Sequence, residues 1–213
     1  MASSGSLAIQ NSRGLTIGDH VGCFCDGPEQ WRTIIQTFFL ERVQENHHCL
    51  YLNDLFPREQ VWALLRSQGL DMQWLQQQGQ LTVLPVSSFF SRAGWPDIEA
   101  LGRHLGQLCR HDRARGFAGM RLMVDMSWAA SSRLHDELLL AFEDFVNQVL
   151  LPQQAMLVVC QFDLALFAPE LLSLIKDKHP LLVDAAGYFR SSWEAPAWPP
   201  DLTAGKLSPA GAF

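Results

Sequence analysis

Met120-Arg-Leu-Met-Val-Asp-Met-Ser-Trp128 is the most informative segment of this chain. Its apolar run from Leu122 to Val124 is typical of a strand that is buried on both faces, and the run ends abruptly at Asp125. Doubly wound α/β proteins present ligand-contacting groups at the carboxyl ends of such strands. The stretch therefore predicts a parallel sheet in which Asp125 contacts a ligand.

Short apolar runs alternate with longer amphipathic segments on both sides of that stretch. The expected strands are His20–Phe24, Cys49–Asn53, Leu81–Pro85, Arg121–Asp125, Met156–Gln161 and Leu181–Asp184. The expected helices are Pro28–Asn46, Pro57–Gln68, Asp71–Gln78, Asp97–Arg115, Ser132–Leu151 and Pro169–Lys178. This alternation predicts a three-layer α/β/α sandwich with a mainly parallel sheet and right-handed crossovers.

The two ends of the chain differ in composition from its middle. Residues 1–17 are rich in serine, glycine and asparagine, which predicts a flexible arm. Residues 194–213 are rich in proline and show no helical period, which predicts a flexible tail. The folded domain is expected to span residues 18–193.

Composition excludes several classes of protein. Hydrophobic residues make up 48% of the 213-residue chain and charged residues 18%, so a substantial core is expected. The net charge of −6, without a basic cluster, argues against direct nucleic-acid binding. No apolar run approaches the roughly 18 residues of a membrane helix, and the N-terminus lacks a signal-peptide pattern. We therefore expect a cytoplasmic protein without membrane contact or a disulfide framework.

The loop after the first expected strand is unsuited to phosphate. The chain has no Gly-x-x-x-x-Gly-Lys-Ser/Thr motif, and the loop reads Cys25-Asp-Gly-Pro-Glu29. Its glycine is followed by a proline, which has no N–H group, and the carboxylates of Asp26 and Glu29 would repel phosphate. Nucleotide hydrolysis by the usual machinery is therefore not expected.

Five local patterns together resemble one known family. They are Gly18–Asp26, Arg121–Trp128, Phe142-Glu143 with Asn147, Cys160-Gln-Phe-Asp163 with Phe167, and His179-Pro180 with Gly187. Their order and spacing resemble the MEDS family, the methanogen/methylotroph sensory domain of the dichloromethane-responsive regulator, from about Gly18 to about Trp193. Cys25 departs from the pattern, because the family often has an aromatic residue there.

The resemblance implies a fold and a role. It implies a ligand-binding sensory domain related to RecA/KaiC-type ATPases, with a degenerate P-loop. Such domains are usually joined to DNA-binding or histidine-kinase modules, so a kinase or a transcription regulator is the expected protein partner. Pairing into a homodimer is compatible with this role, although no heptad pattern demands it.

A RecA-like strand order predicts one ligand crevice at the carboxyl ends of the strands. In such a sheet the first strand lies between the fourth and the fifth, so their carboxyl ends would meet. The residues expected around the crevice are Cys25, Asp26, Asp125, Ser127, Trp128, Gln161 and Asp163. An indole, a thiol and a few polar groups suit a small, partly apolar ligand. The candidate ligand-binding set is completed by His20, Cys23 and Glu143.

Each candidate also has a structural interpretation. The carboxylates of Asp125 and Asp163 are equally suited to capping the turns that follow them. Trp128 is suited to the apolar core. Glu143 and Asn147 share one helix face, where a hydrogen-bond bridge to a loop is the simpler role.

The spacing of the cysteines and histidines does not match a known metal or catalytic site. Cys23 and Cys25 point to one strand face, but no second pair completes a tetrahedral zinc site. Cys25 with Cys160 is a candidate redox or soft-metal pair at one rim of the sheet, and small apolar core residues are the default. His179-Pro180 is expected to set a turn. The sequence identifies no cofactor, metal ligand or catalytic residue.

Three functions remain in competition. The leading hypothesis is a non-enzymatic sensor that binds a small ligand and signals through a partner protein in transcriptional or signal-transduction control. The second is a protein-interaction module with a vestigial site, supported by the aromatic residues Trp193, Trp198 and Phe213 near the end of the chain. The third is a residual nucleotide-binding, ATPase-like protein.

Overall fold

The computed structural model describes residues 15–40, 46–54, 56–89, 97–131, 133–184 and 187–190. The tail at 194–213 and most of the N-terminal arm lie outside these residues. Of the arm only residues 15–17 are described. Leu15 is buried in the core and Ile17 packs against it, so the arm is not loose at this end.

A seven-stranded sheet forms the middle layer of the described fold. Its strands are β1 (His20–Cys25), β2 (His47–Asn53), β3 (Leu81–Pro85), β4 (Gly119–Asp125), β5 (Met156–Asp163), β6 (Leu181–Asp184) and β7 (Gly187–Arg190). The first six are parallel to their neighbours, and β7 runs antiparallel to β6. The expected parallel sheet is confirmed, and β7 is an addition that the sequence analysis did not predict.

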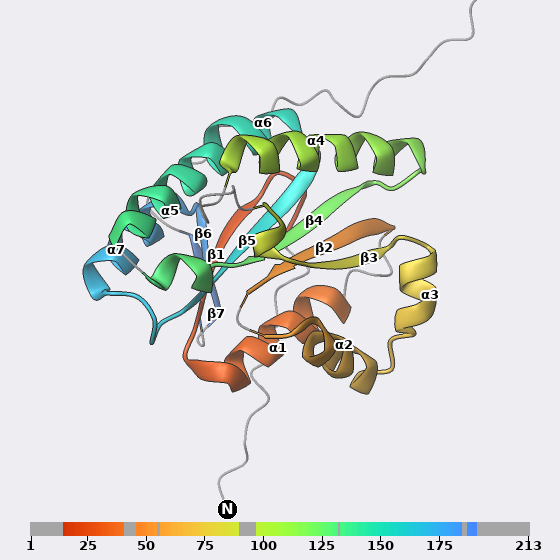
Figure 1. The fold of residues 1–213 in the computed structure, drawn as a ribbon, viewed down its shortest axis with the longest axis horizontal. Coiled ribbons are helices and arrows are strands. Elements are labelled where there is room, and N and C mark those ends of the chain that lie inside the picture. Colours follow the sequence, from red (N-terminus) through yellow and green to blue (C-terminus); the bar gives the residue numbers. More distant parts are fainter. Residues whose placement is uncertain are drawn as a thin grey trace, which may run out of the picture.

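Helices cover both faces of the sheet (Figure 1). The α-helices are α1 (Gly27–Leu40), α2 (Arg58–Ser67), α3 (Met72–Gln77), α4 (Ile98–Ala114), α5 (Arg133–Phe145), α6 (Leu151–Gln153) and α7 (Pro169–Lys178). Helices α1 and α2 lie on one face, and α4, α5 and α7 lie on the other. Short 3-10 helices, η3 (Val86–Phe89) and η4 (Ser127–Ser131), follow β3 and β4, and a π-helix, η5 (Val146–Leu150), continues α5.

The strand order corrects one expectation. The order is β3-β2-β4-β5-β1-β6-β7, so β1 lies between β5 and β6 rather than between β4 and β5. Strand β5 pairs directly with both β4 and β1. The carboxyl ends of the three strands still meet, because Asp125 is in register with Gln161, and Cys25 with Asp163.

The sheet separates two apolar cores. Side chains alternate between its faces along each strand. On β1, Phe24 packs toward α4, α5 and α7, whereas Cys23 and Cys25 pack toward α1, α2 and α3. On β5, Cys160 and Phe162 belong to the first core, and Val159 belongs to the second. A residue's place in the strand therefore decides which core it enters.

Local sequence explains several helix ends. Asp71 and Asp97 cap α3 and α4, where their carboxylates accept hydrogen bonds from the backbone N–H groups of Trp74 and Ala100. Asn46 has a φ of 56°, which is not a helical value. The expected helix Pro28–Asn46 therefore does not extend to Asn46. None of the helices in the described part of the chain is long and apolar enough to cross a membrane.

Candidate functional site

Polar side chains gather where β1, β2, β4 and β5 end, on the face covered by α1. We name this group the carboxyl-end site; its members are Cys25, Trp31, Tyr51, Asn53, Asp125, Gln161 and Asp163. The Cys25 thiol donates a hydrogen bond to the backbone carbonyl of Phe162 at 3.2 Å. Parallel pairing thus brings together four of the residues expected around the crevice: Cys25, Asp125, Gln161 and Asp163.

The two carboxylates of this site hold turns. Asp125 Oδ1 accepts hydrogen bonds from the backbone N–H of Ser127 at 3.0 Å and from its hydroxyl at 2.6 Å. Asp125 Oδ2 accepts one from the backbone N–H of Asp54 at 3.3 Å. Asp163 Oδ1 accepts one from the backbone N–H of Ala165 at 3.0 Å. These contacts agree with the structural interpretation of both residues and fix the loops that border the site.

Other polar atoms of the carboxyl-end site are buried without a hydrogen bond of good geometry. The side chain of Gln161 is 1% exposed, and its amide makes no such bond, although it lies close enough to the Cys25 thiol to oppose the rise in the pKa of that thiol. The Oδ1 atom of Asn53 is also buried and unpartnered, although Nδ2 donates to the carbonyl of Phe56. Buried amides almost always have partners, so these atoms are suited to a ligand or water.

The electrostatics of the site disfavour anions. Burial, followed by the charges of Asp163 and Asp125, raises the pKa of the Cys25 thiol to about 12. Burial and the charge of Asp125 also raise the pKa of Tyr51 well above its usual value, and the same two causes raise the pKa of Asp54. A phosphate group without a counter-ion would be repelled by the charges of these carboxylates, so the site disfavours it.

The thiols are expected to be chemically inert in the native protein. All five cysteines of the chain are free and buried, and burial raises the pKa of both Cys25 and Cys109 to about 12. Because the thiolate is the reactive form, a thiol reagent at about pH 8 should label the native chain slowly and the denatured chain at all five positions. Labelling kinetics followed by mass spectrometry would test this, and one rapidly labelled native thiol would contradict it.

Two expected crevice residues lie elsewhere, as does one further candidate ligand residue. Asp26 is exposed, and its backbone N–H donates to Gln30 at the start of α1. Trp128 is 7% exposed and packs in the core beneath α4, α5 and α7, as its structural interpretation predicted. The further candidate, Cys23, is buried in the middle of β1. The wall of the carboxyl-end site is therefore formed by Trp31 rather than by Trp128.

A second group of polar side chains lies on the opposite face of the sheet. We name it the buried cluster; its members are His20 of β1, Glu143 of α5, Cys160 of β5 and His179, which follows α7. Glu143 Oε2 lies 3.1 Å from His20 Nε2, 3.3 Å from His179 Nε2 and 3.6 Å from Cys160 Sγ. His20 Nε2 lies 3.4 Å from Cys160 Sγ. All four side chains are at most 1% exposed.

Strand positions and one glycine bring the members of the buried cluster together. His20 and Cys160 occupy positions of β1 and β5 whose side chains face α5 and α7. Gly22 lies beside them, and a Cβ atom there would come within 2.9 Å of Cγ of His179. Gly22 is therefore needed because the imidazole of His179 lies directly on its backbone.

Neighbouring residues fix the orientation of both imidazoles. His179 Nδ1 lies 2.8 Å from the backbone carbonyl oxygen of Ile175. His20 Nδ1 lies 2.9 Å from Oδ1 of Asn147, whose Nδ2 donates to the carbonyl of Lys178 at 2.8 Å. Asn147 lies in η5, and single π-helical turns often occur at functional sites. Its bond to Lys178 agrees with the predicted bridge between this helix face and a loop.

The cluster changes the ionisation of its members. Burial would raise the pKa of Glu143, but the charge of His179 and hydrogen bonds from His179 and His20 lower it to about 2. Burial and the charge of His179 lower the pKa of His20, against the opposing effect of Glu143. Burial and the charge of Glu143 raise the pKa of Cys160 well above its usual value. A carboxylate is thus held ionised in the core.

The buried cluster corrects the predicted cysteine pair. Cys25 and Cys160 lie in different cores, on opposite faces of the sheet, because they occupy positions of opposite parity on the paired strands β1 and β5. His20 and Glu143, predicted as ligand contacts with Cys25, belong to the buried cluster instead. The sequence predicts only a turn at His179-Pro180, because nothing in the spacing of His179 shows that α7 returns its end to β1.

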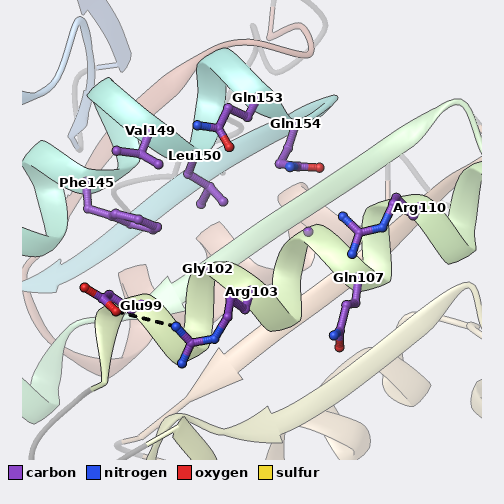
Figure 2. A pocket seen from close by; sticks show the side chains of 11 residues that line it. Glu99, Gly102, Arg103, Gln107, Arg110, Phe145, Val149, Leu150, Gln153 and Gln154 are labelled. Atoms are coloured by element: carbon purple, nitrogen blue, oxygen red, sulfur yellow. Dashed lines mark hydrogen bonds and ion pairs between the residues drawn. The ribbon is translucent and has the colours of Figure 1, made fainter.

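A surface groove lies apart from both groups. It has a volume of about 460 Å³ and runs between α4 and the η5–α6 segment, with Gly102, Arg103 and Phe145 among its lining residues (Figure 2). A Cβ atom at Gly102 would come within 2.3 Å of the ring of Phe145, so this glycine permits the close packing of α4 on α5. None of the candidate ligand-binding residues lines the groove.

One family model matches most of the chain. It is described as MEDS, the MEthanogen/methylotroph, DcmR Sensory domain, and it matches residues 19–180. No curated protein sequence matches the chain.

Solved structures share the fold at low sequence identity. A KaiC-like protein, PH0186 from Pyrococcus horikoshii OT3, is 12% identical with a TM-score of 0.53, over 78% of this chain and 70% of that chain. The flagellar accessory protein FlaH from Methanocaldococcus jannaschii is 13% identical with a TM-score of 0.51, over 85% and 77%. The uncharacterised protein PH0321 from Pyrococcus horikoshii, solved with an unknown peptide, is 10% identical with a TM-score of 0.60, over 84% of both chains. The fold is therefore RecA/KaiC-like.

Proposed function

This chain belongs to the MEDS family of sensory domains, and we propose that it binds a small, partly apolar, uncharged or cationic molecule at the carboxyl-end site. Binding would be read by a protein partner in transcriptional or signal-transduction control. The observation that carries the proposal is the amide of Gln161, which is buried at the sheet edge where open α/β folds bind ligands and makes no hydrogen bond of good geometry.

The surroundings of Gln161 define the class of ligand. Trp31 and Phe56 supply aromatic surface, with ring centroids 3.9 Å apart. The amides of Gln161 and Asn53 supply a donor and acceptors. Asp54 and Asp125 add negative charge, which favours a cationic or neutral molecule over an anion.

A role without catalysis is supported by the loop between β1 and α1. In a phosphate-binding loop, backbone N–H groups and a lysine surround the phosphates. Here Asp26 and Pro28 occupy the corresponding turn, and the N–H of Asp26 is bonded to Gln30. The alternative of a residual ATPase would require magnesium nucleotide to bind beside these carboxylates.

Burial of the site supplies a route from binding to signalling. Cys25, Tyr51 and Gln161 are each at most 1% exposed, so a ligand reaches them only if the covering segments move. A ligand that binds the open state more tightly shifts the equilibrium toward that state. Helix α1 begins at Gly27, two residues after Cys25, and is the element placed to carry this change.

Replacement of Gln161 by methionine separates the ligand role from a structural one. Because the buried amide makes no hydrogen bond of good geometry, Gln161→Met should stabilise the ligand-free protein by about 1 kcal/mol. The same change should abolish stabilisation by a ligand. In the wild type, a ligand at 100 times its Kd would add about 2.7 kcal/mol, or roughly 5–10 °C in melting temperature for this chain length.

The measurement is a thermal-shift screen of wild type and Gln161→Met, followed by calorimetric titration of each active compound. The panel contains small halogenated and one-carbon compounds, amines, short fatty acids and magnesium nucleotides. Gln107→Met, at an exposed position of α4, is the matched control and should keep the response. A response of equal size in Gln161→Met, or a response to magnesium nucleotides alone, would contradict the proposed site.

A further inference from the structure

The buried cluster has the dimensions of a metal site. One ligand atom from each of His20, Glu143, Cys160 and His179 lies within 4.8 Å of the other three. The distances given above, 3.1, 3.3, 3.4 and 3.6 Å, are four of the six edges of the tetrahedron that these atoms define. Zinc bonds of 2.0–2.3 Å to nitrogen, oxygen and sulfur require edges of roughly 3.3–3.8 Å. The other two edges, both of which end at His179 Nε2, are at most 4.8 Å, so the four atoms could surround one ion after a movement of about 1 Å or less.

The tautomers of the two histidines also support a metal site. Nδ1 of His179 faces a backbone carbonyl, which only accepts hydrogen bonds, so this nitrogen carries the hydrogen. Nδ1 of His20 faces the amide oxygen of Asn147. The orientation of the Asn147 amide is set by the hydrogen bond that its Nδ2 donates to the backbone carbonyl of Lys178. Each neutral ring therefore directs the Nε2 lone pair at the centre of the cluster. Metal-binding histidines are held in this way by their second nitrogen.

The charges of the cluster are balanced either by protons on the imidazoles or by a metal ion at the centre. With neutral imidazoles, two nitrogen lone pairs face an oxygen of the Glu143 carboxylate in a core without water access. Such an arrangement is unfavourable unless protons on Nε2 or a metal ion lie between them. A divalent ion would balance the charges of the Glu143 carboxylate and a Cys160 thiolate together. It would also leave both imidazoles neutral.

We propose that His20, Glu143, Cys160 and His179 form a tetrahedral binding site for a zinc ion. Thiolate and imidazole ligands select zinc over magnesium and calcium. Because all four positions come from the protein, the site is closed and its role is structural rather than catalytic. The ion would tie β1, β5, α5 and the end of α7 together on the face opposite the carboxyl-end site.

Cobalt substitution tests this site directly. The full chain, without a histidine tag, is stripped of metal under reducing conditions and titrated with Co²⁺ and, separately, with Zn²⁺. We expect one ion to bind per chain, with the visible bands of tetrahedral cobalt and a near-ultraviolet thiolate-to-cobalt band. Zn²⁺ should displace the cobalt and raise the melting temperature, and a chelator should reverse that rise.

Variants identify the ligands. Cys160→Ser should lose the thiolate-to-cobalt band, and His179→Gln should lose tetrahedral binding. Asn147→Ala leaves the four ligands intact but frees His20, so zinc affinity should fall roughly tenfold to a hundredfold. Cys109→Ser and His48→Gln are matched controls: Cys109 is buried in α4, and His48 pairs with Asp112 at 2.7 Å away from the cluster. Both controls should bind cobalt like the wild type.

Several results would overturn the proposal. They are no uptake of either metal by the folded, reduced chain, a cobalt spectrum without a thiolate band, or a spectrum that is unchanged in Cys160→Ser. If Cys160→Ser fails to fold, the wild-type spectrum and His179→Gln still decide the outcome. Gln161→Met lies on the other face of the sheet and should bind cobalt normally, so failure of this site and failure of the proposed ligand site are distinguishable.

Discussion

Replacement of Glu143 by alanine is expected to lower the free energy of unfolding by about 3–5 kcal/mol, because it breaks a buried charged network and leaves its partners unpaired. Glu143 is fully buried between His20 and His179, and the pKa of its carboxyl is lowered to about 2. Without the carboxylate, two imidazoles and a thiol would face a cavity in the core. Few other single changes in this chain should cost as much.

Urea denaturation followed by circular dichroism would measure this loss, with a chelator present so that bound metal does not contribute. Glu137→Ala is the matched control, because Glu137 lies in the same helix and is exposed. The control should change the free energy of unfolding by less than about 0.5 kcal/mol. A loss in Glu143→Ala as small as that of the control would show that the carboxylate contributes nothing to the core.

Replacement of Phe162 by alanine is expected to lower the free energy of unfolding by about 3–5 kcal/mol through loss of buried surface and formation of a cavity. Phe162 is fully buried on β5. Its ring stacks on Phe24 at 5.3 Å between centroids and meets the edges of Phe167 and His179 at 5.7 Å each. The ring therefore supports the imidazole of His179 as well as the core.

The same denaturation measurement applies to Phe162, with Phe162→Leu as a graded variant that retains most of the side chain. The free energy of unfolding of Phe162→Leu should lie between that of the wild type and that of Phe162→Ala. Trp74→Ala, at an aromatic residue that is 50% exposed, is the control and should have little effect. Equal stability of Phe162→Ala and the control would mean that the core repacks without cost.

The two polar groups of this protein are independent in space, although both involve β1 and β5. The carboxyl-end site faces α1, and the buried cluster faces α5 and α7. Strand β5 contributes Gln161 to the first and Cys160 to the second, so neighbouring residues in the sequence serve different faces. A ligand at one site would reach the other only through movement of the shared strands.

Much of the fold could be predicted from local patterns. The apolar runs around Leu50, Leu122 and Val158 predicted buried parallel strands, because a strand covered on both faces is apolar at consecutive positions. The caps at Asp71 and Asp97 likewise act within one turn of chain. Strand β7 was not predicted, because the four residues Gly187–Arg190 carry too little pattern to indicate a strand.

The sequence alone determined the class of this protein: a mainly parallel α/β domain of the MEDS family without a phosphate-binding loop. These features depend on residues near one another in the chain. Three features emerge only from the folded structure: β1 lies between β5 and β6, Cys25 and Cys160 enter different cores, and His179 returns to His20. Those contacts join residues far apart in the sequence, and their free energy depends on packing and burial, which no local pattern records.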